Sequence, residues 1–417
     1  MAIVRPFKAI RPAADLAGQV AALPYDVMNS QEAREMVANN PHSFLHVDKA
    51  EIDLDPSIDL YDPRVYEKAK ENLNRMIAEG VFIQEDKPCL YIYRQEMDDR
   101  VQIGIVGCTS IDEYRDNVIR KHELTRADKE EDRVRHVDIC DANTGPIFLT
   151  YRSNMYINFR VADFMERHEP VYDFESDDGI SHMVWVIDEG NIIREICGRF
   201  DQVENLYIAD GHHRSASAVR VGMMRRQENP NWNGDEEYNY FLSVIFPDDQ
   251  LYIMDYNRIV KDLNGNTAET FMAKVEEKFA VTPYEAAGVL KPSKKHTYGM
   301  YLAGKWYELA AKDGTYDAAD PVAQLDVSIL QNNLLQPILG IGDPRTDKRI
   351  DFVGGIRGLQ SLADRVDSGE MAVAFSMFPT TMDDLMNIAD AGAIMPPKST
   401  WFEPKLRSGI FIHKLSE

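Results

Sequence analysis

The stretch from Asn205 to Arg220 constrains this chain more than any other, because it joins an apolar run to a helix through a turn of reactive residues. Leu206–Ala209 form the apolar run, which is typical of a buried strand. Asp210 and Gly211 are turn residues, and we expect Asp210 to cap the helix that follows. That helix opens on the basic run His212–Arg214. The pattern therefore predicts a strand, a tight turn and a helix.

Basic side chains are unusual at the start of a helix, because the helix dipole favours acidic residues there. The run His212–Arg214 is explained if an anion, most commonly phosphate, binds beside the free backbone N–H groups of the first turn. A solvent-exposed basic turn is the alternative interpretation. So many reactive groups in one short turn favour a functional site. We therefore predict an anion-binding loop at this point.

Composition narrows the classes of protein to consider. The chain has 417 residues and a net charge of −23, which indicates two or three domains and argues against nonspecific nucleic-acid binding. It has no run of 18 apolar residues, so we expect no membrane span, and its first residues lack the apolar core of a signal peptide. The cysteines are far apart without a C-x-x-C pair, which is typical of reduced thiols in a cytoplasmic protein; they are Cys89, Cys108, Cys140 and Cys197.

Short apolar runs and amphipathic segments follow one another along the chain and predict an α+β protein. In the first hundred residues we expect a strand at 44–47 and a helix at 65–79. Residues 89–93 and 101–106 are expected to form paired strands, and 183–187 and 192–196 a second hairpin. The chain has no polar linker, so the domains should be closely joined.

Three polar clusters together supply what a phosphoryl-transfer site needs: Lys121–Glu123, Asp210–Arg214 and Lys398–Thr400. Cations and backbone amides neutralise the moving phosphoryl group. A carboxylate accepts the proton of the attacking hydroxyl or holds Mg²⁺. Hydroxyl and ammonium groups position a small acceptor. The sequence contains no Walker P-loop, kinase glycine-rich loop or G-x-G-x-x-G fingerprint.

Two other uses of these residues agree less well with the sequence. A transition metal on His212 and His213 is disfavoured, because neighbouring helical positions point about 100° apart and no H-E-x-x-H motif is present. Mg²⁺ held by Asp210 or Glu123 agrees better with the residue types. A nucleophilic Ser215 activated by His212 lacks the G-x-S-x-G turn that would mark it.

At these residues the sequence resembles a large bacterial and archaeal family of unknown function. The resemblance rests on four segments and covers nearly the whole chain; they are Pro24–Val27, Ala209–Arg214, Asp343–Arg349 and Pro397–Arg407. The chain is also similar, more distantly, to the free serine kinases of the ParB/sulfiredoxin superfamily, which phosphorylate serine with ADP or ATP. This resemblance implies an α+β fold of three parts. They are an N-terminal α+β extension (1–100), a ParB/sulfiredoxin-like nucleotide-binding core (101–228) and a C-terminal α+β substrate domain (229–417).

Three kinase motifs recur in the same order. The His-Glu pair, whose glutamate is the base on the serine hydroxyl, resembles His122–Glu123; the loop that holds nucleotide phosphates resembles Asp210–Arg214. The Pro-Lys-Thr-Thr stretch on the amino-acid side resembles Pro397–Thr400. The kinases continue with Arg and His where Trp401 and Phe402 stand here, so we expect different contacts to the acceptor.

The resemblance implies a role for each candidate residue. Glu123, Asp210 and His212 would be catalytic, with Glu123 the general base; Gly211, His213, Arg214 and Ser215 would bind phosphate; Lys398, Ser399 and Thr400 would hold the acceptor. The expected cofactors are ADP or ATP and Mg²⁺, and the expected partner is a small hydroxyl compound such as serine. A nucleotide-binding regulator, acting on DNA like ParB, and a phosphate-ester hydrolase are the alternatives. The sequence leaves open whether the chain forms a homo-oligomer.

Overall fold

The computed structural model describes residues 1–416, which form two compact units. Unit 1 comprises Met1–Leu251 and the C-terminal segment from Pro404 onward, and unit 2 comprises Tyr252–Glu403. This division differs from the expected boundaries after residues 100 and 228. The first of these cuts a β-hairpin, since Met97 pairs with Arg100, and the second separates residues 240–247 from the sheet to which they belong.

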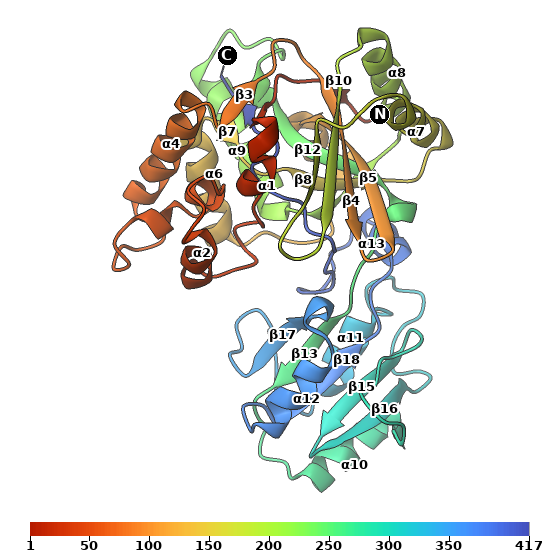
Figure 1. Ribbon diagram of the computed structural model, residues 1–417. Coiled ribbons are helices and arrows are strands. Elements are labelled where there is room, and N and C mark those ends of the chain that lie inside the picture. The colour runs from red at the N-terminus through yellow and green to blue at the C-terminus, as the bar shows by residue number, and fades with distance from the viewer. Residues whose placement is uncertain (417) are drawn as a thin grey trace. The chain divides into compact units, whose positions relative to one another are not determined.

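A mixed sheet forms the centre of unit 1 (Figure 1). Its strands are β1 (Val4–Arg5), β4 (Leu90–Met97), β5 (Arg100–Ser110), β6 (Ile119–Arg120), β8 (Ile147–Tyr151), β9 (Tyr172–Glu175), β10 (Ser181–Ile187), β11 (Leu206–Asp210) and β12 (Tyr240–Pro247). They lie in the order β6-β11-β8-β12-β5-β4-β10-β9, and β1 also pairs with β5. The pairs β11–β6 and β12–β8 are parallel, whereas β11–β8 and β12–β5 are antiparallel.

Helices cover this sheet on both flanks. They are α1 (Ala17–Val20), α2 (Ser30–Val37), α3 (Leu45–Asp48), α4 (Pro63–Ala78), α5 (Ile111–Arg115), α6 (Ala127–Cys140), α7 (Met155–Arg167), α8 (Gly190–Phe200) and α9 (His212–Glu228). In Figure 1, α4 and α6 lie side by side on one flank, and α7 and α8 on the other. Apolar residues of α7, α8 and α9, including Phe164, Ile196 and Val219, join the strands in one core. No helix among residues 1–416 is both long and apolar enough to cross a membrane.

Two small sheets tie the ends of unit 1 together. The strand β2 (Ile10–Pro12) pairs with β3 (Phe82–Gln84), and β7 (Ala142–Asn143) pairs with β19 (His413–Lys414). The second pair returns the C-terminal segment to unit 1, where His413 is buried and its Nδ1 donates a hydrogen bond to Oδ1 of Asn143.

Unit 2 is a separate antiparallel sheet with its own helices. The strands are β13 (Tyr256–Val260), β14 (Phe279–Pro283), β15 (Thr297–Leu302), β16 (Lys305–Ala311), β17 (Ile350–Gly354) and β18 (Val373–Met377), in the order β14-β16-β15-β18-β13-β17. The helices are α10 (Ala268–Lys278), α11 (Asp326–Leu330), α12 (Gln360–Asp367) and α13 (Met382–Asp390). Leu362 and Ala363 of α12 pack on this sheet in an apolar core of their own. The chain thus has the expected mixed α+β architecture.

Two predicted strands are helical. Residues 44–47 largely belong to α3, and 192–196 lie within α8. A short apolar run does not distinguish a strand from a buried helix turn. In α8 the buried residues Ile192, Ile196 and Phe200 recur every four positions, which is the spacing of one helix face. The predicted hairpin at 183–196 was therefore wrong in its second half.

Candidate active site

The two central motifs meet because they follow parallel neighbouring strands. Leu206 of β11 pairs with Ile119 of β6, and Tyr207 pairs with Arg120. Glu123 comes three residues after the end of β6, and Asp210 is the last residue of β11. Side chains that follow the carboxyl ends of adjacent parallel strands face one edge of a sheet, which is where α/β proteins commonly bind ligands.

The turn between β11 and α9 depends on Gly211. Gly211 has φ +94° and is the N-cap of α9, so the expected cap by the Asp210 side chain is wrong. The Asp210 carboxylate instead accepts the Gly211 N–H at 2.8 Å. A Cβ at Gly211 would lie 3.2 Å from the Arg214 guanidinium. A glycine is needed here because other residues resist this left-handed backbone and the guanidinium fills the space.

Asp210 is paired with a cation from the far end of the chain. The other carboxylate oxygen, Oδ2, lies 2.9 Å from Nζ of Lys405. Burial opposes ionisation of Asp210, but the charges of Lys405 and Arg214 outweigh it and hold the pKa of this carboxyl well below its usual range. Asp210 is therefore an anion held by donors of the protein itself.

His122, Glu123 and His212 form a compact cluster beside this turn. One ligand atom from each residue lies within 4.8 Å of the others, and the two imidazole rings meet edge to face with centroids 4.4 Å apart. Both histidines are buried. Burial lowers the pKa of His122 to about 4, and burial together with the neighbouring His122 lowers the pKa of His212 well below its usual range.

The run His212–Arg214 was expected to be basic, and the lowered pKa values of its histidines show that this expectation is wrong for them. His212 is neutral at pH 7, and burial also lowers the pKa of His213. The positive charge at the start of α9 is therefore that of Arg214, together with the first-turn amides and the helix dipole. Histidines here act as hydrogen-bonding groups and not as fixed cations.

The remaining loop residues have definite partners. His213 Nε2 accepts the backbone N–H of Arg126 at 3.0 Å, and Arg214 donates to the carbonyl of Pro146 at 2.5 Å. Ser215 is fully buried and its hydroxyl donates to the Gly211 carbonyl at 3.0 Å. The Ser215 hydroxyl thus bonds to the backbone of the first turn of its own helix.

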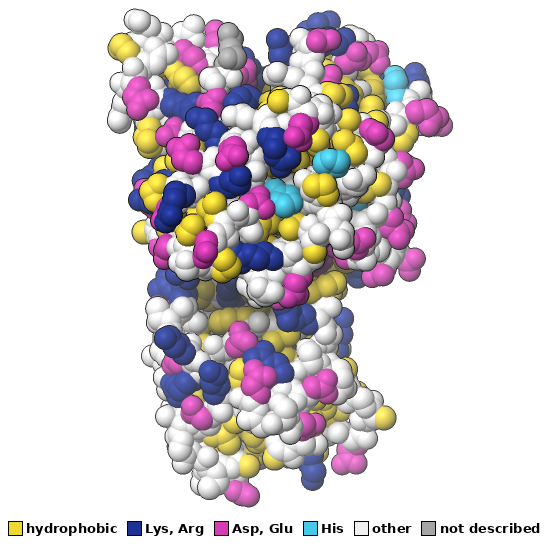
Figure 2. Space-filling model, turned by 60° about the vertical axis from the view of Figure 1, so that its left-hand side comes forward, with side chains coloured by type: hydrophobic (Ala, Val, Ile, Leu, Met, Phe, Trp, Pro, Cys, Tyr) yellow, Lys and Arg dark blue, Asp and Glu magenta, His cyan; other side chains and the backbone are white. Residues whose placement is uncertain are grey.

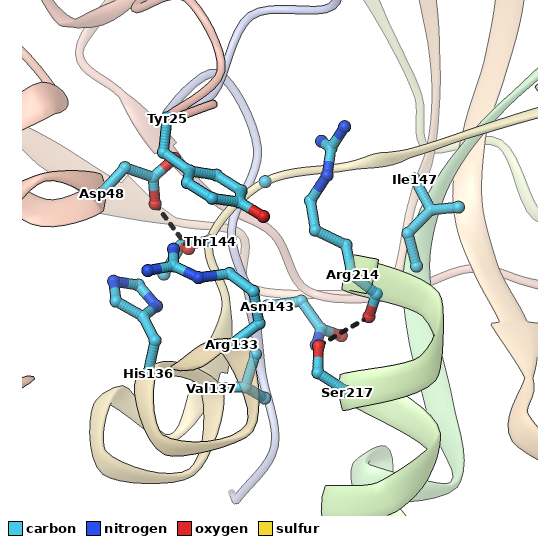
Figure 3. A pocket seen from close by; sticks show the side chains of 11 residues that line it. Tyr25, Asp48, Arg133, His136, Val137, Asn143, Thr144, Ile147, Arg214 and Ser217 are labelled. Carbon is cyan, nitrogen blue, oxygen red and sulfur yellow. Dashed lines mark hydrogen bonds between the residues drawn. The ribbon is translucent and has the colours of Figure 1, made fainter. Parts of the chain in front are cut away.

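A small cavity adjoins the loop (Figure 3). It is lined by Tyr25, Arg133 and Arg214 among others, and the Arg133 guanidinium lies 4.0 Å from the centre of the Tyr25 ring. Beside them, buried Asp48 accepts a hydrogen bond from Thr144. The cavity volume is about 20 Å³, which is room for about one water molecule and too little for a nucleotide.

The predicted acceptor segment lies in unit 2. Ser399 is buried there, donating to the Pro396 carbonyl at 2.6 Å. Lys398 has φ +59° and its Nζ lies 5.6 Å from the centre of the Tyr256 ring. The role of Lys398, Ser399 and Thr400 in holding an acceptor stays a prediction.

Three residues near the loop were not among the predicted site residues: Lys405, Arg133 and Tyr25. Lys405 stands inside the segment Pro397–Arg407 and Tyr25 inside Pro24–Val27, two of the segments that carry the resemblance. Their place in these segments is the sequence feature that could have identified them as site residues. Nothing in the pattern of Arg133 distinguishes it from the other charged residues of α6, since its burial is visible only in the fold.

Comparison with known proteins gives a family but no activity. Residues 4–328 match DUF1015, which is described as a protein of unknown function. No curated protein matches the chain significantly.

Several solved structures are similar to this chain at low sequence identity. A conserved hypothetical protein from Pyrococcus furiosus is 14% identical, with a TM-score of 0.36, over 74% of this chain and 94% of that chain. Free serine kinase in complex with AMP is 13% identical, with a TM-score of 0.37, over 74% and 91%. SbnI with a C-terminal truncation, from Staphylococcus aureus, is 11% identical, with a TM-score of 0.39, over 73% and 85%.

Proposed function

We propose that this chain, which belongs to the DUF1015 family of proteins of unknown function, is a small-molecule phosphotransferase. It would move a phosphoryl group from ADP or ATP to a hydroxyl acceptor such as L-serine. One observation carries the proposal: the Glu123 carboxylate follows β6, and the glycine-started helix α9 follows the parallel neighbour β11. Glu123 would act as the base, and the start of α9 would bind the phosphate, at the same edge of the sheet.

In the proposed reaction the acceptor hydroxyl gives its proton to a Glu123 oxygen while its own oxygen attacks the terminal phosphorus of the nucleotide. A new O–P bond forms, and the bond from that phosphorus to the bridging oxygen breaks. The electron pair of the broken bond stays on the bridging oxygen, so the leaving group is AMP from ADP or ADP from ATP. Most catalysis of this kind is positioning and charge stabilisation.

The phosphate would rest on the first turn of α9. Amides at the start of a helix have no partners within the helix, and the dipole adds partial positive charge there. Arg214 supplies a full charge close to Gly211. His212 and His213, being neutral, would contribute hydrogen bonds alone.

The residues at this edge are a poor match for Mg²⁺, which prefers an octahedral shell of oxygen ligands. The two oxygens of Asp210 accept hydrogen bonds from Gly211 and Lys405. Glu123 lies beside two imidazoles, whose nitrogens are poor ligands for this ion. We therefore assign Mg²⁺ no step on this chain, and the nucleotide is the cofactor of the proposal.

The test is an assay with labelled ADP or ATP and a panel of amino and hydroxy acids. Transfer of label to L-serine or another acceptor, dependent on this chain, supports the proposal. Release of inorganic phosphate from O-phosphoserine without transfer would favour the hydrolase instead. Nucleotide binding without either reaction would favour a regulator.

Charge favours the small-molecule reaction over DNA binding. The chain carries −23, and on the face drawn in Figure 2 the Lys and Arg side chains are interspersed with Asp and Glu. Proteins that bind DNA without sequence preference present clustered positive charge to its phosphates. A salt-dependent shift of DNA at physiological ionic strength would contradict this part of the proposal.

A further inference from the structure

The geometry points to a site for one divalent transition-metal ion of the Mn²⁺-to-Zn²⁺ series, held by His122, Glu123 and His212. A ligand atom from each of the three lies within 4.8 Å of the other two. Atoms bound to one Zn²⁺ at about 2.0–2.2 Å in a tetrahedral site are roughly 3.3–3.5 Å apart. Closing the cluster onto an ion thus needs side-chain shifts of about an ångström or less.

The strongest support is a set of buried nitrogens whose hydrogen-bonding capacity is unused. Among residues 1–416, Nδ1 and Nε2 of His122 and Nε2 of His212 have no hydrogen-bond partner. His122 is 1% exposed and His212 is 6% exposed. Buried polar atoms in folded proteins are nearly always paired. A metal ion accepts the one lone pair of a neutral imidazole, so it explains the unpaired Nε2 of His212 and one of the two unpaired nitrogens of His122.

The donor set selects the class of ion. Two imidazole nitrogens and one carboxylate oxygen suit Mn²⁺, Fe²⁺, Co²⁺, Ni²⁺ and Zn²⁺, whereas Mg²⁺ and Ca²⁺ prefer oxygen alone. Three protein ligands leave one position of a tetrahedral ion for water or another small ligand. Glu123 is half-buried, in contrast to the two histidines.

The ligands are not the pair that adjacency in the sequence suggests. His213 accepts the backbone N–H of Arg126, and His212 instead faces His122, which follows the parallel strand β6. The perpendicular rings, 88° apart, differ from the stacked arrangement of buried His182 with Tyr93. His182 also has hydrogen bonds at both nitrogens, to Tyr93 and Ser176. Buried His182 is therefore paired at both nitrogens, whereas His122 is paired at neither and His212 lacks a partner at Nε2.

Binding of the ion at this site does not depend on the proposed phosphotransfer. A chain without any kinase activity would still bind the ion, and an active kinase without the ion would refute only the metal site.

The test uses the full-length chain without an affinity tag, stripped with EDTA and dialysed. We expect Co²⁺ to bind at one equivalent per chain, to give visible d–d absorption and to be displaced by Zn²⁺. Calorimetry should show Zn²⁺ binding at least about 100-fold tighter than Mg²⁺. Equal affinity for the two ions, or no stoichiometric Co²⁺ binding, would overturn the site.

Variants assign the ligands. His212→Asn and His122→Asn should each weaken Co²⁺ binding by at least about 10-fold. The matched control His213→Asn, at the next position of the same helix, should change it less than about twofold. Unchanged binding in both His212→Asn and His122→Asn would overturn the assignment.

A measurement on the unaltered chain guards against variants that fail to fold. X-ray absorption of the Zn²⁺-loaded chain should show two imidazole ligands with Zn–N near 2.0 Å. A spectrum of oxygen ligands alone would contradict the site regardless of how the variants behave.

Discussion

Nζ of Lys405 lies 2.9 Å from Oδ2 of Asp210, although 195 residues separate the two in the sequence. This ion pair fixes the C-terminal segment of unit 1 to the turn that begins α9. The Asp210 side chain is 30% exposed and that of Lys405 11%, so the pair is only partly screened by water. Lys405 is thereby a positioning residue for the Asp210–Gly211 turn.

Lys405→Met should destabilise the chain by about 2–3 kcal/mol, because it leaves the Asp210 carboxylate half-buried without its cation. The free energy of unfolding, from denaturant titration monitored by circular dichroism, measures the change. Lys405→Met combined with Asp210→Asn should recover part of the loss, since the unpaired charge is then gone.

Lys414→Met is the matched control. Lys414 also pairs with an aspartate, Asp141, at 3.2 Å, but that carboxylate is held as well by Arg225. We expect a cost below about 1 kcal/mol, because Arg225 still pairs with the Asp141 carboxylate in this variant. Equal losses in the two lysine variants would contradict a special role for Lys405.

Gly211→Ala should weaken nucleotide binding by about 10-fold or more, because a Cβ would press on the Arg214 guanidinium and strain a backbone at φ +94°. Gly234→Ala separates strain from binding, since Gly234 has φ +98° with open space around its Cβ position. Each change should cost about 1 kcal/mol of stability, but Gly234→Ala should leave nucleotide affinity unchanged by calorimetry. Equal affinities in both variants would argue against the turn as the phosphate site.

Glu113 predicts a specific dependence of stability on pH. Both its oxygens accept the N–H of Ile3, at 2.9 and 3.0 Å, and burial raises its pKa from 4.5 to about 7. The folded chain binds this proton more tightly than the unfolded chain, so the contribution is full below pH 4.5 and is lost as pH rises through 7.

Between pH 4.5 and pH 8 the wild type should therefore lose about 2–3 kcal/mol of unfolding free energy relative to Glu113→Gln. Denaturant titrations at several pH values measure this difference, in which the other titrating groups cancel. A constant difference over that range would show that the Glu113 pKa is not raised.

The sequence contained enough to predict the strand, turn and helix around Asp210, because an apolar run, an Asp-Gly turn and a helical segment follow one another directly. Resemblance to kinase motifs also predicts His122 and Glu123 as candidate site residues. The reason that they meet His212 is the parallel pairing of β6 with β11, and a strand of only two residues leaves little trace in a pattern.

Other features depend on tertiary contacts that local patterns do not encode. Leu45 and Val47 are buried in a helix that adjoins α4, and Asn72 of α4 donates to the His46 carbonyl. The same apolar run in a sheet would have looked alike in the sequence. The charge state of His212 was likewise out of reach, because it follows from burial against His122.

Bound metal and the proposed reaction should compete for Glu123, because a carboxylate that coordinates an ion is a weaker base. The chain preloaded with one Zn²⁺ should transfer phosphate at least about 10-fold more slowly in a single turnover than the metal-stripped chain. EDTA treatment of the loaded chain should restore the rate. Equal rates in loaded and stripped chains would contradict a shared carboxylate.

The role of Glu123 is tested most directly by comparing Glu123→Gln with the wild type in nucleotide affinity and in the rate of phosphate transfer. We expect nucleotide affinity to stay within about threefold while the rate falls by at least about 100-fold, because the variant keeps the shape of the side chain but lacks the base. Glu131→Gln, an exposed acid in α6 that pairs with Arg220 and Arg135, should keep the wild-type rate. Transfer by Glu123→Gln at the wild-type rate would contradict the role of Glu123 as the base.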